Sequence, residues 1–486
     1  MEATSRTYDV VVIGAGPVGE NVADRTRAAG LSTVIVEREL LGGECSFWAC
    51  EPSKALLRPV VARADARGVP GLNRAVDGPL DVAAVLAHRD ELAAHWTDGD
   101  QVDWLASVSV DLVRGHGRLT GPRQVSVHTG DGAVVHLTAR HAVVLSTGGG
   151  TAWPDVPGLD SARPWTNREA TSADRVPDRL AVMGGGVVAV ELATAWQALG
   201  SQVTLLVRGD GLLTKMEPFA GELVADELRA AGVDIRLKTS VTSVTRANGP
   251  DGEVRITLAD GAEVSADEIL VATGRAPRTD DVGLETVGLP AGDWLTVDDT
   301  FRVTAVADGW LYAVGDVNHR ALLTHQGKYQ ARIAGAAIGA RAKGEPVDEA
   351  RYGAHVATAD HTAVPQVVFS TPEIASVGLT TQEARRSGRH VDVVDYDLAH
   401  LAGAHQYAHG YRGRARMLVD PDRGIVVGVT FAGPGVAELV HSATIAVAGE
   451  VPLERLWHAV PAFPTLGEVW LRLLETYRDT GRPARR

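Results

Sequence analysis

Two glycine-rich segments, each between a strand pattern and a helix pattern, constrain the fold of this chain more than any other feature. The first is Gly14-Ala-Gly16-Pro-Val-Gly19, which follows the apolar run 9–13 and opens a helical stretch. The next strand pattern ends on Glu37. In a βαβ unit such glycines admit a pyrophosphate, and an acid about 20 residues further on accepts the ribose hydroxyls. The segment predicts a dinucleotide site that includes Glu37, with an ordinary glycine-rich turn as the alternative.

The pattern recurs in the middle of the chain. The apolar run 180–183 leads into Gly184-Gly-Gly186-Val-Val-Ala189, where alanine replaces the third glycine, as the looser pattern permits. Val207 stands at the end of the next strand, where an NAD site would carry its acid, and Arg208 follows. A guanidinium in place of a carboxylate suits a ribose 2′-phosphate, so NADPH is favoured over NADH. The alternative is a surface arginine beside a permissive pocket.

Cys45 and Cys50 are the only cysteines among 486 residues. No further CxxC or histidine pair completes a structural zinc site, and a lone structural disulfide is uncommon in a long chain that buries its own core. A redox-active pair is therefore favoured, with two inert buried thiols as the alternative. Five residues of straight helix advance about 7.5 Å, beyond the roughly 4.4 to 6.8 Å that a disulfide prefers between Cα atoms. The backbone between the cysteines is expected to be irregular.

The size and charge of the chain narrow the range of partners. A chain of 486 residues exceeds what one hydrophobic core usually serves, which predicts about three domains. The formal net charge of -14 disfavours nucleic acid and anionic membranes, since both favour clustered lysine and arginine. No secretory signal pattern and no apolar run near the ~20 residues of a membrane span is present. We expect a cytoplasmic protein that is not inserted in a membrane and holds no metal.

The nucleotide motifs and the dithiol segment together resemble the class I pyridine nucleotide-disulfide oxidoreductases. These FAD enzymes include dihydrolipoamide dehydrogenase, glutathione reductase, mycothione reductase and mercuric reductase. The resemblance runs from about Tyr8 to about Tyr477, and its motifs occur in the order of the family. The later motifs are Ser146-Thr-Gly-Gly149, Ala272-Thr-Gly-Arg-Ala-Pro277 and Leu311-Tyr-Ala-Val-Gly-Asp316.

The resemblance implies an α/β fold with two Rossmann-like dinucleotide-binding domains and a C-terminal α+β dimerisation domain. Residues 1–150 would begin the FAD-binding domain, 151–280 would bind NAD(P)H, 281–350 would return to the FAD-binding domain, and 351–486 would form the interface domain. Family members are homodimers, so a homodimer is expected. In the last domain, alternating apolar residues at 424–431 predict a strand, and the apolar run 436–449 predicts a helix.

The resemblance also assigns roles to single residues. Cys50 would face the flavin, and Cys45 would attack an external acceptor, which requires a thiolate and hence a lowered pKa. Lys54 resembles the lysine near the flavin N5 and Glu191 resembles its acidic partner, with a solvated lysine and an exposed carboxylate as the alternatives. The other residues that the resemblance assigns to the cofactors are Gly43, Thr147, Gly148, Gly274, Arg275, Gly315, Asp316 and His325.

Two departures from the family concern the substrate. Phe47 and Trp48 replace small or polar residues between the cysteines, and their rings either fill the core or line the flavin cavity. The segment Phe463-Pro464-Thr465-Leu466-Gly467-Glu468 matches the family's His-Pro-Thr and Glu, with phenylalanine in place of histidine. Phenylalanine cannot transfer a proton, and loss of a general acid-base group costs ~10²- to 10⁴-fold. Either Glu468 or His458 replaces the histidine, or the acceptor needs no proton from the enzyme.

Three functions agree with these features. The first is an FAD-dependent NAD(P)H oxidoreductase that uses Cys45 and Cys50 to reduce a small-molecule disulfide or another sulfur-containing acceptor without the usual histidine. The second is a reductase of quinones or other electron acceptors in which the cysteines are dispensable. The third is an NADPH-binding flavoprotein that acts as a sensor or structural partner. Mercuric reductase activity is disfavoured because no C-terminal cysteine pair exists to receive the metal.

Overall fold

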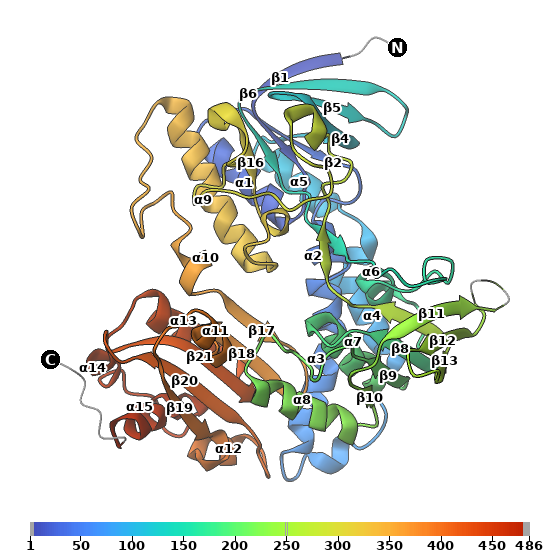
Figure 1. Ribbon diagram of the computed structural model, residues 1–486, viewed down its shortest axis with the longest axis vertical. Helices are drawn as coiled ribbons and strands as arrows, with labels where there is room; N and C mark the ends of the chain where they lie inside the picture. Colours follow the sequence, from blue (N-terminus) through green and yellow to red (C-terminus); the bar gives the residue numbers. More distant parts are fainter. Residues whose placement is uncertain (1–3, 248, 250, 480–486) are drawn as a thin grey trace. The chain divides into compact units, whose positions relative to one another are not determined.

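The structure is a computed structural model that describes residues 4–247, 249 and 251–479. It forms two compact units, and Figure 1 labels their elements. The first unit combines Met1–Pro52, Asp90–Ala152 and Arg275–His361, and the second combines Ser53–Arg89, Trp153–Gly274 and Thr362–Arg486. None of the helices in the described part of the chain is long and apolar enough to span a membrane.

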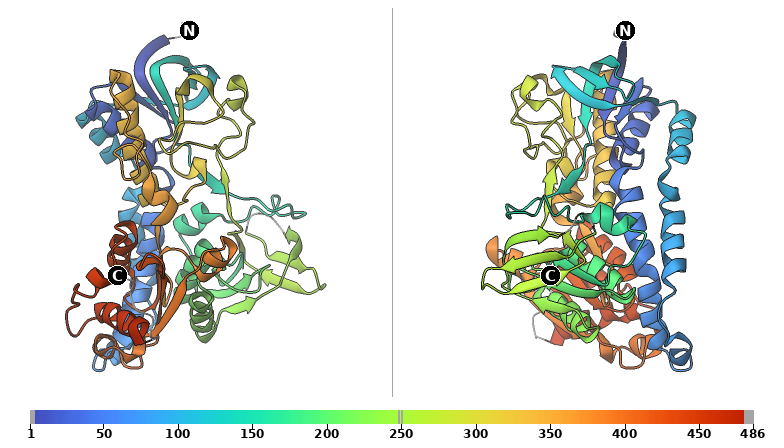
Figure 2. Two further views of the ribbon diagram at one scale, coloured as in Figure 1. Left: turned by 60° about the vertical axis from the view of Figure 1, so that its left-hand side comes forward. Right: turned by 90° about the vertical axis from the view of Figure 1, so that its right-hand side faces the viewer.

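The first unit is built on a seven-stranded sheet. Its strands in spatial order are β3 (Asp111–Arg114), β2 (Thr33–Glu37), β1 (Thr4–Ile13), β6 (Val134–Leu145), β5 (Gln124–His128) and β4 (His116–Gly121), and β16 (Leu311–Ala313) also pairs with β6. The pairs β3–β2, β2–β1, β1–β6 and β6–β16 are parallel, whereas β5 and β4 are antiparallel. Both views in Figure 2 show β1 beside β6. A separate antiparallel pair joins β7 (Gly149–Thr151) to β15 (Arg275–Pro277).

Helices lie between these strands along the chain. Those of the first unit are α1 (Pro17–Ala28), α2 (Gly43–Phe47), α5 (Gly99–Ser107) and α9 (Thr324–Lys343). Helix α1 packs against α9 along most of its length. Three helices cross the boundaries between the units: α3 (Cys50–Arg67), α4 (Val82–Leu92) and α10 (Thr358–Thr362).

The second unit contains three sheets. A parallel sheet orders β10 (Asp234–Arg236), β9 (Gln202–Leu206), β8 (Arg179–Met183) and β14 (Glu268–Val271). An antiparallel sheet orders β11 (Val241–Arg246), β12 (Val254–Leu258) and β13 (Glu263–Ala266). A second antiparallel sheet orders β17 (Pro365–Val368), β18 (Glu373–Gly378), β21 (Ile425–Gly433), β20 (Arg414–Asp420) and β19 (Asp392–Asp397).

The helices of the second unit fall into two groups along the chain, one near the parallel sheet and one in the C-terminal part. Those near the parallel sheet are α6 (Asn167–Ser172), α7 (Val187–Ala198) and α8 (Pro218–Ala230). Those of the C-terminal part are α11 (Thr381–Arg386), α12 (Ala402–Tyr407), α13 (Val440–Ala448), α14 (Leu453–Leu456) and α15 (Val469–Asp479). The strand and helix predicted at 424–431 and 436–449 correspond to β21 and to α13 with the short turn before it. The predicted α/β fold with a C-terminal α+β part is confirmed, whereas the expected domain boundaries stay predictions.

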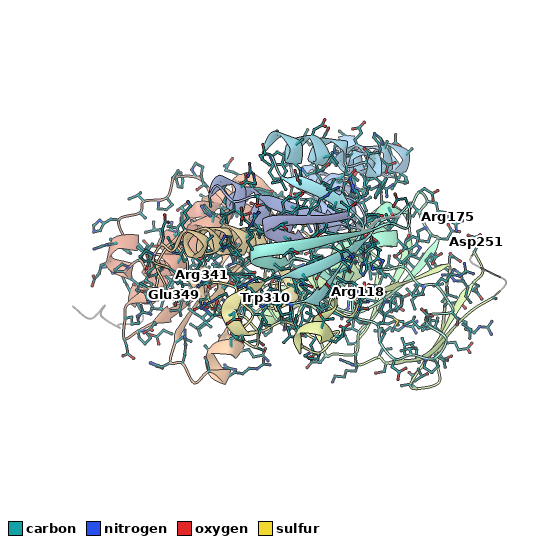
Figure 3. All side chains as sticks on the ribbon, turned by 90° about the horizontal axis from the view of Figure 1, so that it is seen from above. Arg118, Arg175, Asp251, Trp310, Arg341 and Glu349 are labelled. Carbon is teal, nitrogen blue, oxygen red and sulfur yellow. The ribbon has the colours of Figure 1, made fainter. Side chains whose placement is uncertain are left out.

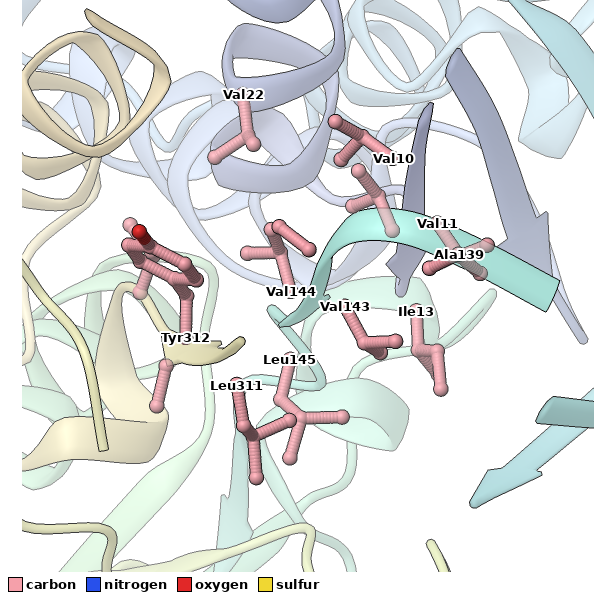
Figure 4. Packing of buried hydrophobic residues seen from close by; sticks show 14 of the residues in the cluster. Val10, Val11, Ile13, Val22, Ala139, Val143, Val144, Leu145, Leu311 and Tyr312 are labelled. Carbon is pink, nitrogen blue, oxygen red and sulfur yellow. The ribbon is translucent and has the colours of Figure 1, made fainter. Parts of the chain in front are cut away.

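The core of the first unit explains the continuous apolar runs in the sequence. Val10, Val11 and Val12 of β1 have no exposed surface, because parallel strands are covered on both faces. Figure 4 shows side chains of β1 and α1 beside residues of β6 and of β16. This packing brings the carboxyl ends of β1 and β6 together, at the edge of a parallel sheet where nucleotides usually bind.

Candidate functional site

The first glycine turn has the geometry of a phosphate-binding loop. Gly14 has a φ of +100°, and a Cβ on it would lie 2.5 Å from the carbonyl oxygen of Ser146. A Cβ on Gly19 would lie 1.9 Å from the carbonyl oxygen of Gly14, so only glycine allows helix α1 to start this close to the strand. At Gly16, the N-cap of α1, a Cβ would meet nothing within 4 Å. The open space beside a helix N-terminus suits an anionic group.

The acid of this motif lies at the loop. Glu37 ends β2, and its Oε2 accepts a 2.7 Å hydrogen bond from the backbone N–H of Ala15. Thr147 follows β6, and its hydroxyl is buried without a hydrogen-bond partner among the described residues. A buried polar group without a partner is costly, so this hydroxyl indicates a bound polar group that completes the site. These features fit the ribose and pyrophosphate of FAD.

Glu20 lies in the first turn of α1 and was not predicted from the sequence. Burial raises its pKa to about 7, the positive charge of Lys328 acts in the opposite direction, and Glu37 adds to the rise. One carboxylate oxygen of Glu20 is buried without a hydrogen-bond partner within the described part of the chain. A carboxyl group that is partly neutral at pH 7 repels a nearby pyrophosphate less than a full charge does. The residue is therefore compatible with the proposed FAD site.

A charged cluster follows the glycine turn. Arg275 contacts Glu44 at 3.2 Å and Asp316 at 3.7 Å, and it donates a 2.6 Å hydrogen bond to the carbonyl of Gly149. Arg278 pairs with the other oxygen of Glu44 at 2.5 Å. Burial raises the pKa of Asp316, and the charge of Arg275 acts against it. The sequence predicted Arg275 and Asp316 as cofactor ligands but missed Glu44, whose only signal was its place before Cys45.

The two thiols lie in two different helices. Cys45 belongs to α2, and Cys50 is the first residue of α3. Trp48 ends α2 with a φ of -140°, so the expected irregular backbone between the cysteines is present. Both cysteines are free thiols, and the hydroxyl oxygen of Thr324 lies 3.2 Å from each sulfur. Thr324 was not predicted, and its only sequence signal was its place beside His325.

The pKa of Cys45 differs from the sequence expectation. A hydrogen bond with Cys50 raises it first, burial and the negative charge of Cys50 raise it further, and a hydrogen bond with Thr324 lowers it. The exposed Glu51 adds a small increase. The expected lowered pKa is therefore wrong for the reduced pair, because the two sulfurs share one site and only one of them readily holds a negative charge.

The two aromatic residues between the cysteines differ in how deeply they are buried. Phe47 is 1% exposed and its carbonyl accepts a 3.1 Å hydrogen bond from the indole of Trp96. Its ring lies 5.7 Å from the ring of Trp48, which is half-buried. Phe47 therefore fills the core, and the alternative that its ring lines a pocket is wrong.

The second unit contains the predicted pair of Lys54 and Glu191. The ammonium of Lys54 lies 2.8 Å from Oε2 of Glu191, whose side chain is 5% exposed because it lies on the buried face of α7. The other oxygen of Glu191 accepts a 3.0 Å hydrogen bond from the backbone N–H of Phe369, and the ring of Phe369 lies 5.1 Å from the ammonium. The exposed-carboxylate alternative for Glu191 is wrong. Sequence reasoning missed Phe369, which lies far along the chain from both.

The second glycine turn repeats the geometry of the first. Gly184 has a φ of +132°, and a Cβ on it would lie 2.3 Å from the carbonyl oxygen of Ala272. Gly186 is the N-cap of α7, and a Cβ there would meet nothing within 4 Å. Val207 is buried at the end of β9, whereas Arg208 is exposed. The turn therefore has space for a phosphate, and an exposed guanidinium follows the neighbouring strand.

The remaining predicted residues are four glycines and one histidine. Gly43 begins α2 against Gly16, Gly148 and Gly315 have positive φ angles in loops of the first unit, and His325 is exposed near the start of α9. Gly274 ends a segment of the second unit and has a φ of +145°.

The C-terminal segment that matches the family's histidine motif is exposed. The side chain of Phe463 is 75% exposed and that of Val460 is 85% exposed. Glu468 is buried, and its Oε1 pairs with Arg472 at 3.1 Å. Its other oxygen is buried without a hydrogen-bond partner among the described residues. His458 is exposed, so Glu468 is the buried candidate of the two.

The chain therefore combines two glycine turns of the dinucleotide-binding kind with a pair of adjacent thiols. Residues 8–339 match the pyridine nucleotide-disulphide oxidoreductase family, and residues 364–473 match the dimerisation domain of that family. The chain belongs to this family of FAD-dependent oxidoreductases and carries its dimerisation domain.

Individual relatives cover nearly the whole chain. Dihydrolipoyl dehydrogenase 3 of Pseudomonas aeruginosa is 32% identical over 95% of this chain and 96% of its own length. Mercuric reductase of Acidithiobacillus ferrooxidans is 31% identical over 94% of this chain and 80% of its own length. The crystal structure of LpdA from Mycobacterium tuberculosis has a TM-score of 0.80 at 25% identity and covers 97% of this chain and 99% of that one. The HOCl-induced flavoprotein disulfide reductase RclA from Escherichia coli has a TM-score of 0.80 at 23% identity, covers 96% of this chain and 99% of that one, and shares the fold.

Proposed function

We propose that this protein is an NADPH-dependent FAD oxidoreductase in which Cys45 and Cys50 pass electrons to a small-molecule disulfide or another sulfur-containing acceptor. The observation that carries the proposal is the pair of adjacent thiols that both contact the Thr324 hydroxyl, in the unit that contains the first glycine turn. Two inert core thiols would have apolar neighbours, whereas these two share a polar neighbour, the Thr324 hydroxyl.

FAD would be held by the glycine turn, Glu37, Thr147 and Asp316. When bound, FAD accepts hydride from the nicotinamide and transfers two electrons to a disulfide. The N-terminus of α1 and its open space at Gly16 favour the negative pyrophosphate, and the Thr147 hydroxyl gains a partner. Lys54 keeps the role that the family resemblance gives it, which is to supply a positive charge for the reduced cofactor. Glu191 holds the Lys54 ammonium in place.

The acceptor is expected to be one whose reduction makes little demand on a general acid. Phe463 has no transferable proton, and one of the two oxygens of the Glu468 carboxylate is already paired with Arg472. A disulfide with a stable leaving thiolate meets this condition. The raised pKa of Cys45 also favours a second candidate, which is direct transfer of electrons to a quinone without use of the thiols.

Anaerobic titration of the purified protein with NADPH tests the proposal. A working dithiol is expected to produce a two-electron state with a long-wavelength charge-transfer band between thiolate and flavin. The absorbance spectrum is recorded after each addition, and Cys50→Ser serves as the matched variant that should lack the band. Direct bleaching of the flavin without the band in the unmodified protein would contradict the dithiol function and favour the quinone reductase.

Arg208→Ala is expected to lower kcat/KM for NADPH about 10-fold and leave kcat/KM for NADH within about 2-fold, since hydrogen bonds to charged groups are worth roughly 1.5 to 3 kcal/mol. The cause would be loss of a guanidinium that pairs with the 2′-phosphate. Steady-state kinetics with both nucleotides measure the ratio. Arg229→Ala, which removes a surface arginine of α8, is the control and should change neither value. Equal losses with both nucleotides would show that Arg208 does not select NADPH.

A further inference from the structure

A network of buried side chains connects α10 to the loop that follows β16. Gln330 of α9 lies at its centre with no exposed surface, and the side chain of Asp360 in α10 is 1% exposed. The NH2 group of Gln330 donates a 2.9 Å hydrogen bond to Oδ2 of Asp360. The carbonyl of Gln330 accepts hydrogen bonds from the backbone N–H of Gly315 at 2.9 Å and from the side-chain NH2 of Asn318 at 2.8 Å. The whole network lies within the first unit.

The backbone fixes the orientation of the two amide side chains in this network. The N–H of Gly315 can only donate, so the carbonyl end of the Gln330 amide faces it and the NH2 end faces Asp360. The Asn318 amide is oriented in the same way, because its oxygen accepts a 3.0 Å hydrogen bond from the backbone N–H of Arg320. A reversed Gln330 amide would place donors against the donors of the loop. The network therefore has one orientation.

The network holds the loop on both sides of Asp316, one of the residues expected to bind FAD. Gly315 precedes Asp316 and Asn318 follows it, and both bind the same oxygen of Gln330. A Cβ on Gly315 would lie 3.1 Å from the side chain of Val18, so the loop lies against the first turn of α1, beside the first glycine turn. A ligand side chain is held in place only if the backbone that carries it is supported.

Asp360 is the charged end of the network. Its two oxygens accept hydrogen bonds from the NH2 group of Gln330 and, at 2.5 Å, from that of Gln326. Burial raises the pKa of Asp360, whereas the two amide donors and the positive charges of Arg320, 3.8 Å away, and of His361 act in the opposite direction. A carboxylate offers only acceptors, so it binds the NH2 end of the Gln330 amide and leaves the carbonyl end for the loop.

We propose that Asp360 and Gln330 position the Asp316 loop for the binding of FAD. This inference rests on the proposed function, which assigns Asp316 to FAD. Asp360 binds the donor end of the Gln330 amide, and the acceptor end then holds the loop on both sides of Asp316. Without the amide, the N–H groups of Gly315 and Asn318 lose a buried partner, and the loop is free to leave the geometry in which Asp316 meets FAD. Both residues act through Asp316 and are positioning residues.

Release of FAD from the loaded full chain tests this inference without reference to any electron acceptor. The loaded protein is diluted in steps, ultrafiltration separates the released FAD, and its fluorescence gives the Kd. Gln330→Met removes the amide and keeps the length of the side chain. Gln330→Glu keeps an acceptor for the loop but places a second carboxyl group against Asp360. Gln124→Met and Gln124→Glu, at an exposed glutamine of the same unit, are the matched controls, and Asp316→Ala measures the contribution of the loop ligand itself.

Gln330→Met is expected to raise the Kd of FAD about 10-fold at neutral pH, as for buried N–H groups left without an acceptor. Gln330→Glu is expected to stay within about 2-fold of the unmodified protein at about pH 5.5, where a proton shared with Asp360 replaces the amide donor. At about pH 8.5 that proton is lost, the two carboxylates repel each other, and the Kd is expected to rise about 10-fold. Each Kd is divided by that of the unmodified protein at the same pH, because the pKa of Glu20 near the site is raised to about 7.

The inference is overturned if Gln330→Met keeps the Kd of the unmodified protein, or if Gln330→Glu gives the same ratio at both pH values. It is also overturned if Asp316→Ala keeps its FAD, since the loop would then not hold the cofactor. Circular dichroism checks the fold, and a Gln330→Met protein that does not fold leaves Gln330→Glu, in which one protein is compared with itself at two pH values. A full chain that binds no FAD would reject the proposed function, whereas unchanged binding in the Gln330 variants would reject this inference alone.

Discussion

Replacement of Cys45 by serine is expected to lower turnover of disulfide acceptors by about 10³-fold or more, while NADPH still reduces the flavin. A serine hydroxyl is almost never ionised at neutral pH and cannot form a disulfide with Cys50, so the route from the flavin to a sulfur acceptor ends. The flavin itself is reduced by hydride, which needs no thiol. Turnover is measured as NADPH oxidation with a small aromatic disulfide, with lipoamide and with a quinone in parallel.

Ser46→Ala is the matched control for this variant, since it alters the neighbouring residue of α2 and leaves both sulfurs. It is expected to keep turnover within about 2-fold, as for most substitutions away from a reacting group. Cys45→Ser with full turnover of the quinone and none of the disulfide would mean that both routes exist. Retained disulfide turnover in Cys45→Ser would contradict the proposed function outright.

The second large effect concerns stability. Glu217→Ala is expected to lower the free energy of unfolding of the second unit by ~3 kcal/mol, because removal of one partner of a buried ion pair leaves the other charge with less compensation. Glu217 precedes α8 and has no exposed side-chain surface. Its carboxylate pairs with Arg416 of β20 at 2.7 Å and accepts hydrogen bonds from the backbone and hydroxyl of Thr381. Asp395 still pairs with Arg416 at 2.7 Å, which places the loss near the lower end for such pairs.

Denaturant unfolding followed by tryptophan fluorescence measures this loss. Asp251→Ala is the control. It removes the ion pair between Asp251 and Arg175, which is equally short at 2.7 Å but has both side chains exposed (Figure 3). Water and salt screen such a pair, so this variant should unfold at the same denaturant concentration as the unmodified protein. Equal midpoints for both variants would show that the contacts of Glu217 with Arg416 and Thr381 do not stabilise the second unit.

The sequence predicted those parts of the site that depend on neighbouring residues. Both glycine turns lie between the strand and the helix that their patterns indicate, because a close approach of helix and strand requires the absence of a side chain at Gly14 and Gly184. The interruption of the helix between Cys45 and Cys50 was predicted because five residues of straight helix separate two Cα atoms by more than a disulfide allows. The contact of Lys54 with Glu191 came from the family resemblance, since no local pattern connects residues so far apart.

The sequence did not predict contacts made by residues that belong to no recognisable motif. Thr324, Phe369 and Glu44 are ordinary residues in the sequence, and each gains its importance only from the side chains beside it. The pKa of Cys45 was expected to be lowered, because a reactive thiol in isolation must ionise. The distance to Cys50 reverses that expectation, since two sulfurs in contact do not both ionise readily.

By itself the sequence therefore determined the fold class, the two nucleotide turns, the identity of the thiol pair and the replacement of a histidine by Phe463. These depend on local periodicity, backbone conformation and residue chemistry, which short stretches of chain contain. Only the tertiary structure decided that Phe47 fills the core, that Glu191 is buried against Lys54 and that a threonine hydroxyl contacts both sulfurs. Burial and hydrogen bonding are properties of segments brought together by packing, so they are absent from any one stretch of the chain.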